Sequence, residues 1–179
     1  MLTLQPFASE ADLAGLNLQS TLLWSEGVLR LQFRLQAPDG LLQLANPASH
    51  RQRRDGLWQT TCFEAFIGVA GQAQYWEINL ASSEDWNVYR LEAYRQGLVE
   101  EERLKTIAIQ QHRQCREGLL ELELSAQIAL GDILDDACQL EGSLTAVLET
   151  SRGGLSYWAL KHSGPEPDFH RRDSFCWRS

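Results

Sequence analysis

Long apolar runs, internal repeats and familiar catalytic motifs are missing from this sequence of 179 residues. No apolar run approaches the ~20 residues that a membrane-spanning helix needs, so we expect no membrane partner. No basic N-terminal segment leads into an apolar stretch, as it would in a secretory signal, and we therefore expect a cytoplasmic protein. The nucleophile motif G-x-S-x-G, the zinc motif H-E-x-x-H and a glycine-rich phosphate loop are also absent, which removes common signatures of hydrolases and nucleotide enzymes.

Sulfur-containing residues are scarce as well. Met1 is the single methionine, which argues against a Met/His pair for haem iron. The four cysteines are scattered and form no C-x-x-C pair; they are Cys62, Cys115, Cys138 and Cys176. In a chain without an export signal, such cysteines are expected to be free thiols.

Basic residues are outnumbered by acidic ones, 16 to 24, and the formal net charge is -8. An acidic chain lacks the electrostatic footprint of a nucleic-acid-binding protein, so we expect no nucleic-acid partner. The short basic runs at 51–54 and 171–172 are expected to be solvated loops. The length fits one domain, 1–179, in which the aromatic-bearing tail 163–179 packs back onto the rest.

Alternating apolar and polar residues recur in many short segments, whereas helical periodicity is rare. This pattern predicts an all-β fold, an antiparallel β-sandwich of the jelly-roll or immunoglobulin-like kind. A capped turn at 9–16, starting at Ser9, and one helical turn at 125–134 are the expected exceptions. The predicted strands are 18–24, 28–36, 62–69, 75–80, 86–95, 104–112, 119–125, 140–150 and 155–162, with short segments at 3–7 and 41–44.

The segment 62–80 predicts a hairpin with a defined register. Gly71 followed by Gln72 suits a two-residue type II′ turn. That turn places Glu64 opposite Asn79 and Phe66 opposite Glu77 on one face. The other face is apolar and carries Phe63, Ala65, Ile67, Trp76, Ile78 and Leu80. Trp76, and Trp158 in a later strand, are therefore expected in the core.

Motifs around this hairpin resemble those of the DOMON-like domains, which are relatives of the family 9 carbohydrate-binding modules. Leu57-Trp58 precedes Cys62-Phe63-Glu64-Ala65-Phe66, as a Leu-Trp pair precedes an acidic VExF strand in those modules. Glu121-Leu-Glu-Leu-Ser, Tyr157-Trp-Ala-Leu-Lys-His and Pro167-Asp-Phe-His fit the same subgroup. The resemblance implies a ligand-binding β-sandwich whose ligands are sugars or haem.

The polar face of the hairpin is the main candidate binding site. Carboxylates and an amide offer directional hydrogen bonds to sugar hydroxyls, and aromatic rings offer flat apolar faces for a pyranose. Two other interpretations of this polar face are possible. It could be a structural network in which an arginine neutralises the carboxylates, or a Ca²⁺ site built from oxygen ligands. The candidate residues are Glu64, Glu77 and Asn79, with Trp58 and Trp86 at the rim and Arg95 as a counter-charge.

His162, Asp168 and His170 near the end of the chain form a second candidate set. Histidine could ligate haem iron or a divalent metal. The spacing matches no compact metal motif, so we expect no metal site and no haem in the purified protein. Loop residues that hydrogen-bond to the end of the sandwich are the simpler interpretation.

Together these features predict a non-catalytic module that binds a small ligand, with a saccharide as the favoured class. A structural or protein-interaction β-sandwich without a ligand is one alternative. A glycoside-processing enzyme that uses the two carboxylates, or a haem-binding domain, is another.

The cysteine pattern gives a first testable prediction. Thiol titration under denaturing, non-reducing conditions should find four free thiols per chain. A finding of none would contradict both the expected redox state and the expected compartment.

Overall fold

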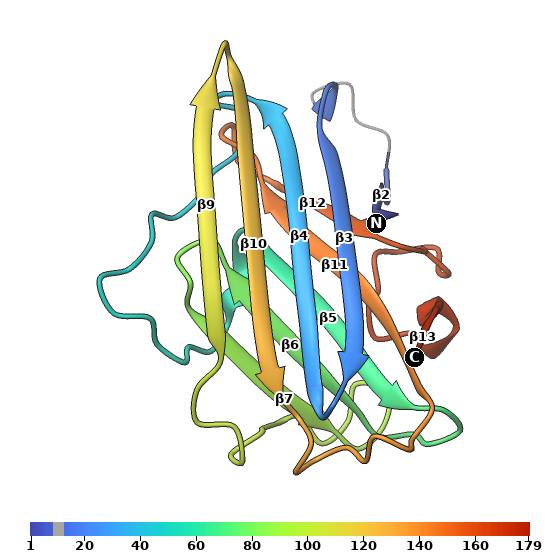
Figure 1. Cartoon of the computed structure of the whole chain (residues 1–179). Coiled ribbons are helices and arrows are strands. Elements are labelled where there is room, and N and C mark those ends of the chain that lie inside the picture. The colour runs from blue at the N-terminus through green and yellow to red at the C-terminus, as the bar shows by residue number, and fades with distance from the viewer. Residues whose placement is uncertain (9–12) are drawn as a thin grey trace.

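The structure is a computed structural model, and it describes residues 1–8 and 13–179. Two antiparallel sheets pack face to face (Figure 1). Sheet A contains five strands in the order β1-β3-β4-β10-β9, and sheet B contains β2-β12-β11-β5-β6-β7-β8, with β13 paired to β11. The all-β antiparallel sandwich predicted from the sequence is therefore confirmed.

The strands follow the predicted segments closely over most of the chain. Sheet A consists of β1 (Leu2–Thr3), β3 (Asn17–Ser25), β4 (Val28–Pro38), β9 (Ala108–Arg116) and β10 (Leu119–Ala129). Sheet B consists of β2 (Gln5–Pro6), β5 (Cys62–Val69), β6 (Tyr75–Ala81), β7 (Trp86–Leu91), β8 (Val99–Glu100), β11 (Leu140–Glu149), β12 (Leu155–Ala159) and β13 (Trp177–Arg178). Two 3₁₀ turns, η2 (Leu57–Gln59) and η3 (Arg172–Ser174), lie beside sheet B.

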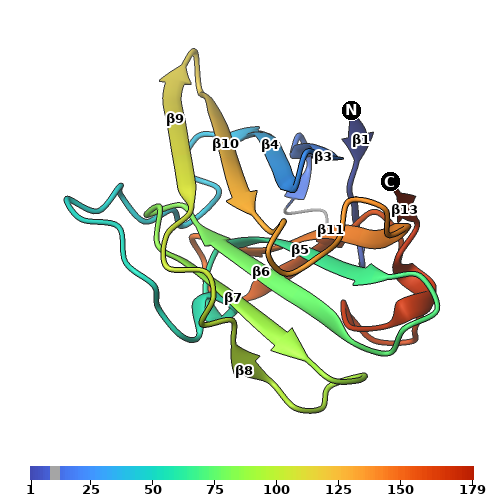
Figure 2. The ribbon, with the colours of Figure 1, turned by 60° about the horizontal axis from the view of Figure 1, so that its bottom comes forward.

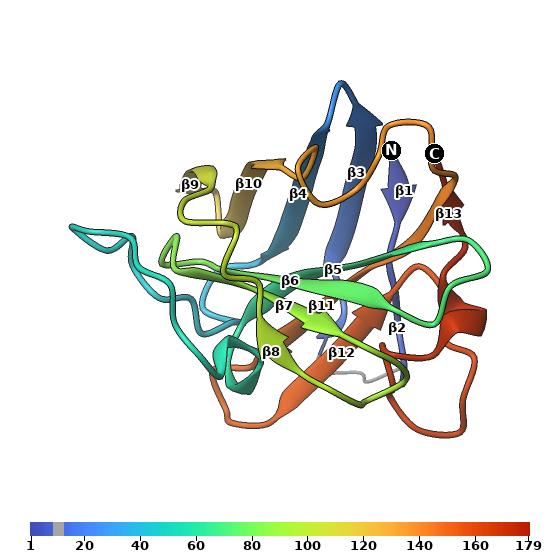
Figure 3. The same cartoon turned by 90° about the horizontal axis from the view of Figure 1, so that it is seen from below.

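Side-chain alternation explains why the two sheets pack together. Apolar residues on the inner faces, among them Leu29, Phe33, Phe63, Ile78 and Leu124, are fully buried. Phe33 of sheet A and Phe63 of sheet B meet across the interface with ring centroids 5.2 Å apart. Figure 3 shows the two sheets as separate layers from below.

Several predicted boundaries are wrong. The segment 41–44 forms only an isolated bridge, Leu42 to Thr150. The strand predicted at 86–95 ends at Leu91, because the chain turns sharply at 93–96 and Arg95 adopts a positive φ of 52°. The strand predicted at 104–112 begins at Ala108, and the helical turn predicted at 125–134 is instead the end of β10 followed by turns. Residues 9–12 of the turn predicted at 9–16 lie outside the described residues.

The predicted hairpin register is confirmed, although the predicted turn is wrong. Glu64 pairs with Asn79 and Phe66 pairs with Glu77, as expected. The turn, however, is closed by a hydrogen bond from Gln72 N to Val69 O, so Gly71 is its second central residue, with φ 79°. A positive φ at that position explains the glycine. The register does not depend on this turn, because the strand pairing begins only at Gly68 and Tyr75.

The C-terminal segment 163–179 passes along the outer face of sheet B, the face turned away from sheet A, and ends in β13, which pairs with β11 as part of that sheet (Figure 2). Phe175 is buried there, and Arg172 donates to Val69 O at 2.9 Å and pairs with Glu141 at 2.6 Å. A Cβ atom on Gly68 would lie 1.8 Å from Nη1 of Arg172, so a larger residue there would displace this guanidinium.

Two broader findings follow for the part of the chain that the structure describes. It contains no helix long and apolar enough to cross a membrane. The cysteines found there, at the four positions named above, are all free thiols.

The inter-sheet core yields a stability prediction. Phe63→Ala should lower the free energy of unfolding by about 3–5 kcal/mol, because it removes a fully buried ring and leaves a cavity. Leu23→Ala is the control, since Leu23 is 56% exposed and its loss should cost less than about 0.5 kcal/mol. Urea denaturation measures both; equal effects would contradict the assigned core.

Candidate ligand-binding site

A cavity of about 530 Å³ lies on the outer face of sheet B. Its floor comes from β5, β6, β11 and β12, and its rim comes from η2, the 92–98 turn and the C-terminal segment. The lining residues are Trp58, Gln59, Glu64, Phe66, Glu77, Leu91, Arg95, Leu98, Val147, Leu155, Tyr157, Pro167, Phe169 and His170. The polar face of the hairpin thus forms the floor of a cavity whose walls are largely aromatic and aliphatic.

Glu64 is the most deeply placed acid in this floor. It is only 2% exposed, and Oγ1 of Thr145 on β11 donates to its Oε2 at 3.1 Å. Burial, and then repulsion from Glu77, raise the pKa of Glu64 to about 8. At neutral pH this side chain is therefore mainly a neutral carboxylic acid, able to donate one hydrogen bond and to accept others.

Glu77 stands diagonally across the hairpin from Glu64 and is 5% exposed. Nδ2 of Asn79 donates to its Oε1 at 2.8 Å. Burial raises the pKa of Glu77, while that hydrogen bond and the charge of Arg95 oppose the rise. The Oδ1 atom of Asn79 is buried and finds no hydrogen-bond partner among the described residues.

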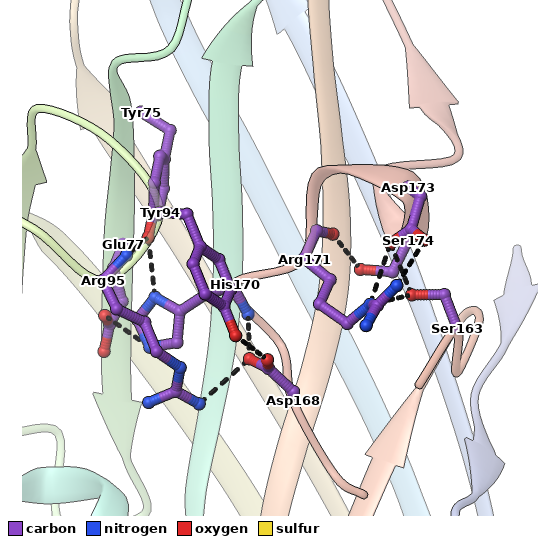
Figure 4. Close-up of polar contacts among 10 residues, drawn as sticks. All are labelled: Tyr75, Glu77, Tyr94, Arg95, Ser163, Asp168, His170, Arg171, Asp173 and Ser174. Carbon is purple, nitrogen blue, oxygen red and sulfur yellow. Dashed lines mark hydrogen bonds and ion pairs between the residues drawn. The ribbon is translucent and has the colours of Figure 1, made fainter. Parts of the chain in front are cut away.

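His170 lines the cavity, and Figure 4 shows it between Tyr75 and Glu77 on one side and Asp168 on the other. Its Nδ1 shares a hydrogen bond of 2.8 Å with the hydroxyl of Tyr75, and its Nε2 lies 3.9 Å from Oε2 of Glu77. Burial, and then the charge of Arg95, lower the pKa of His170 to about 4. The imidazole is therefore neutral at pH 7 and does not offset the charge of Glu77.

Arg95 reaches the cavity rim from the turn that follows β7. Its Nη2 donates to Oδ1 of Asp168 at 2.9 Å, and the hydroxyl of Tyr94 donates to the other oxygen of that carboxylate (Figure 4). Asp168 also accepts from the backbone N–H of His170 at 3.1 Å. This latch fixes the C-terminal segment to the turn, and it engages the arginine with Asp168 rather than with the floor.

The C-terminal segment is also braced internally, as Figure 4 shows. Asp173 accepts from Oγ of Ser163 at 2.6 Å and pairs with Arg171 at 2.8 Å. Oγ of Ser174 donates to the carbonyl of Arg171. These bonds hold the segment that presents Phe169 and His170 to the cavity.

Aromatic rings line the cavity from both sides. Phe169 of the C-terminal segment lies 6.3 Å from Phe66 of β5 and 6.1 Å from Tyr157 of β12, measured between ring centroids. Trp58 of η2 packs edge-on against Tyr89 at 5.7 Å, at another part of the rim. Such rings offer flat apolar faces next to the polar floor.

One interpretation of the sequence is a structural network in which an arginine neutralises Glu64 and Glu77. Among the ion pairs of the described residues, none joins an arginine or a lysine to Glu64 or Glu77. Within the same residues, no group of three or more His, Cys, Asp or Glu side chains could hold a metal ion.

The structure brings together only some of the site residues predicted from sequence. Glu64, Glu77, Trp58, Arg95 and His170 line one cavity. Asn79 lies beneath it, and Asp168 stands behind Arg95 and His170.

Two predicted site residues lie away from the cavity. Trp86 is 3% exposed and packs in the core between the sheets, with the guanidinium of Arg53 4.5 Å above its ring. It is the first residue of β7, and its position in the register turns it inward, next to Leu80. His162 bonds through Nε2 to the carbonyl of Gln5 at 2.9 Å. Trp76 and Trp158 are in the core, as predicted.

Sequence reasoning did not assign a binding role to Phe66, Tyr157 or Phe169. Tyr157 had a detectable signal, because it alternates with the inward-facing Trp158 and must therefore point outward. Phe169 lies in the C-terminal segment, and the sequence around it does not predict where that segment packs on sheet B.

The chain is thus an antiparallel β-sandwich with a cavity on one outer sheet face. Comparison with known protein families and with curated proteins finds no match, so the DOMON-like resemblance stays a prediction. Among solved structures, a protein from Bacteroides uniformis ATCC 8492, described provisionally as carbohydrate-binding, superposes with a TM-score of 0.67 at 12% sequence identity. The superposition covers 97% of this chain and 84% of that one, and the two therefore share a fold.

Two structures of a family 9 carbohydrate-binding module from Caldicellulosiruptor kristjanssonii are more distant. The complex with glucose gives a TM-score of 0.40 at 14% identity, over 86% of this chain and 69% of that one. The complex with cellotriose gives 0.44 at 14% identity, over 87% and 70%. These scores are too low to establish a shared fold.

The raised pKa of Glu64 predicts a pH-dependent stability. Its folded-state pKa, about 8, lies above the ordinary value of 4.5, so this group's contribution to stability is fully present below pH 4.5 and is lost as the pH rises through 8. Between pH 5 and 9 the free energy of unfolding should fall by about 2–4 kcal/mol.

Glu64→Gln cannot ionise and should remove most of that fall. Glu121→Gln, on the outer face of sheet A, is the matched control and should keep it. Urea denaturation over the pH series measures all three proteins. A fall of the same size in Glu64→Gln would show that other groups cause it.

Proposed function

We propose that this chain is a non-catalytic carbohydrate-binding module whose saccharide site is the cavity on sheet B. The observation that carries the proposal is the combination, in one cavity, of a floor of buried hydrogen-bonding groups and walls of aromatic rings. A volume of about 530 Å³ falls within the ~300–1,000 Å³ common for small-molecule sites.

Each part of the cavity has a chemical counterpart in a sugar. The carboxyl groups of Glu64 and Glu77 can bond to neighbouring hydroxyls, and a saccharide that leaves either unmatched loses about 1–3 kcal/mol. Tyr157 and Phe169 offer ring faces to the apolar C–H side of a pyranose. The similar fold of the Bacteroides protein, provisionally described as carbohydrate-binding, agrees with this proposal.

The aromatic wall allows a direct test. A glycan array should first identify a bound saccharide, and calorimetry should then measure its affinity. Tyr157→Ala should weaken binding by about tenfold, because a stacking face is lost. Tyr157→Phe keeps the ring and should bind within a few-fold of the unmodified protein.

Two outcomes would contradict the proposal. One is the absence of any bound saccharide on the array. The other is a saccharide whose affinity is unchanged by Tyr157→Ala while the melting temperature shows that the variant is folded. The second result would place the sugar elsewhere on the protein.

A further inference from the structure

The cavity contains more acidic than cationic side chains. Arg95 is the cationic side chain among the lining residues, and its guanidinium is engaged by the carboxylate of Asp168 at 2.9 Å. These two charges offset each other at the rim. The floor still holds two carboxyl groups, Glu64 and Glu77, and neutral His170 does not compensate them.

Burying both carboxylates in ionised form is unfavourable, because they repel each other and have lost most of their water. The free protein lowers this cost by keeping a proton on the pair. A neutral saccharide would leave that proton in place. An ammonium group could replace the proton, since its three N–H donors and its positive charge suit two ionised carboxylates on neighbouring strands.

The walls favour the same kind of ligand. Phe66 lies directly opposite Glu77 across the hairpin, and Phe169 and Tyr157 continue the aromatic surface from Phe66. The face of an aromatic ring attracts a cation, by about 0.5–2 kcal/mol depending on exposure to water. Rings beside buried acids therefore form a surface that distinguishes cationic from neutral ligands.

We infer that the saccharide bound in this cavity is an amino sugar with a free ammonium group, held between Glu64 and Glu77. This inference rests on the proposed carbohydrate-binding function and narrows its ligand class.

Binding of this kind has a defined proton balance. The ligand enters as the ammonium form, Glu64 loses its proton to solvent, and the complex contains an ammonium–carboxylate pair. The titratable groups that act directly on Glu64 are Glu77 on β6 and Cys62 on its own strand. Arg95, Tyr157 and His170 line the same cavity. Affinity should therefore rise with pH from about 5 until the amine itself deprotonates.

Calorimetry with glucosamine, glucose and N-acetylglucosamine tests the inference. At pH 6.5, glucosamine should bind at least about tenfold more tightly than the two neutral sugars. Measurements in two buffers of different ionisation enthalpy should show proton release with glucosamine, up to one per site, and none with glucose. Glu64→Gln should abolish the proton release and reduce the preference to less than about threefold, whereas Glu121→Gln should preserve both.

The outcomes separate this inference from the proposed function. Equal affinities for the three sugars, or array hits confined to neutral saccharides, would overturn the amino-sugar inference and leave carbohydrate binding in place. Binding of cyclohexylamine as tightly as glucosamine would show that the cavity recognises cations without recognising sugar, and would overturn the inference as stated. If no saccharide binds at all, the proposed function fails first.

Discussion

The burial of two acidic side chains, Glu64 and Glu77, on one sheet face is the constraint on which the outer half of this protein depends. Alternation along β5 and β6 forces Glu64 and Glu77 to the same side. Keeping them buried requires a cover, which the C-terminal segment supplies, and local donors, which Thr145 and Asn79 supply. The latch of Asp168 with Arg95 then holds the cover in place without neutralising the floor.

Much of the fold can be predicted from the alternation of apolar and polar residues along each strand. The register of β5 with β6 could be predicted because a shift of one residue would bury polar groups between the sheets and expose apolar ones. The exact turn could not, because Gly71 suits either central position of a tight turn. The end of β7 was missed because alternation continues past Leu91, and the positive φ of Arg95 leaves no mark in the sequence.

The site was less predictable than the fold, for a physical reason. The acidic residues of its floor lie on one hairpin, and their common face follows from strand geometry alone. The rest of the floor, on β11 and β12, and the rim, from η2, the 92–98 turn and the C-terminal segment, come together only by long-range packing. Trp86 illustrates the limit, since a tryptophan at the start of a strand suits a rim or a core equally well, and the register of β7 decides between them.

The cavity can be completed only late in synthesis, because the C-terminal segment forms part of its wall. Gly68 lies in the first strand of the hairpin, yet the side chain that fills the space above it, Arg172, belongs to the C-terminal segment. A nascent chain could pair β5 with β6 while the acids of the floor still face water. Only when the C-terminal segment leaves the ribosome can the cavity acquire its far wall, so a chain truncated before that segment could keep a sandwich and lack a binding site.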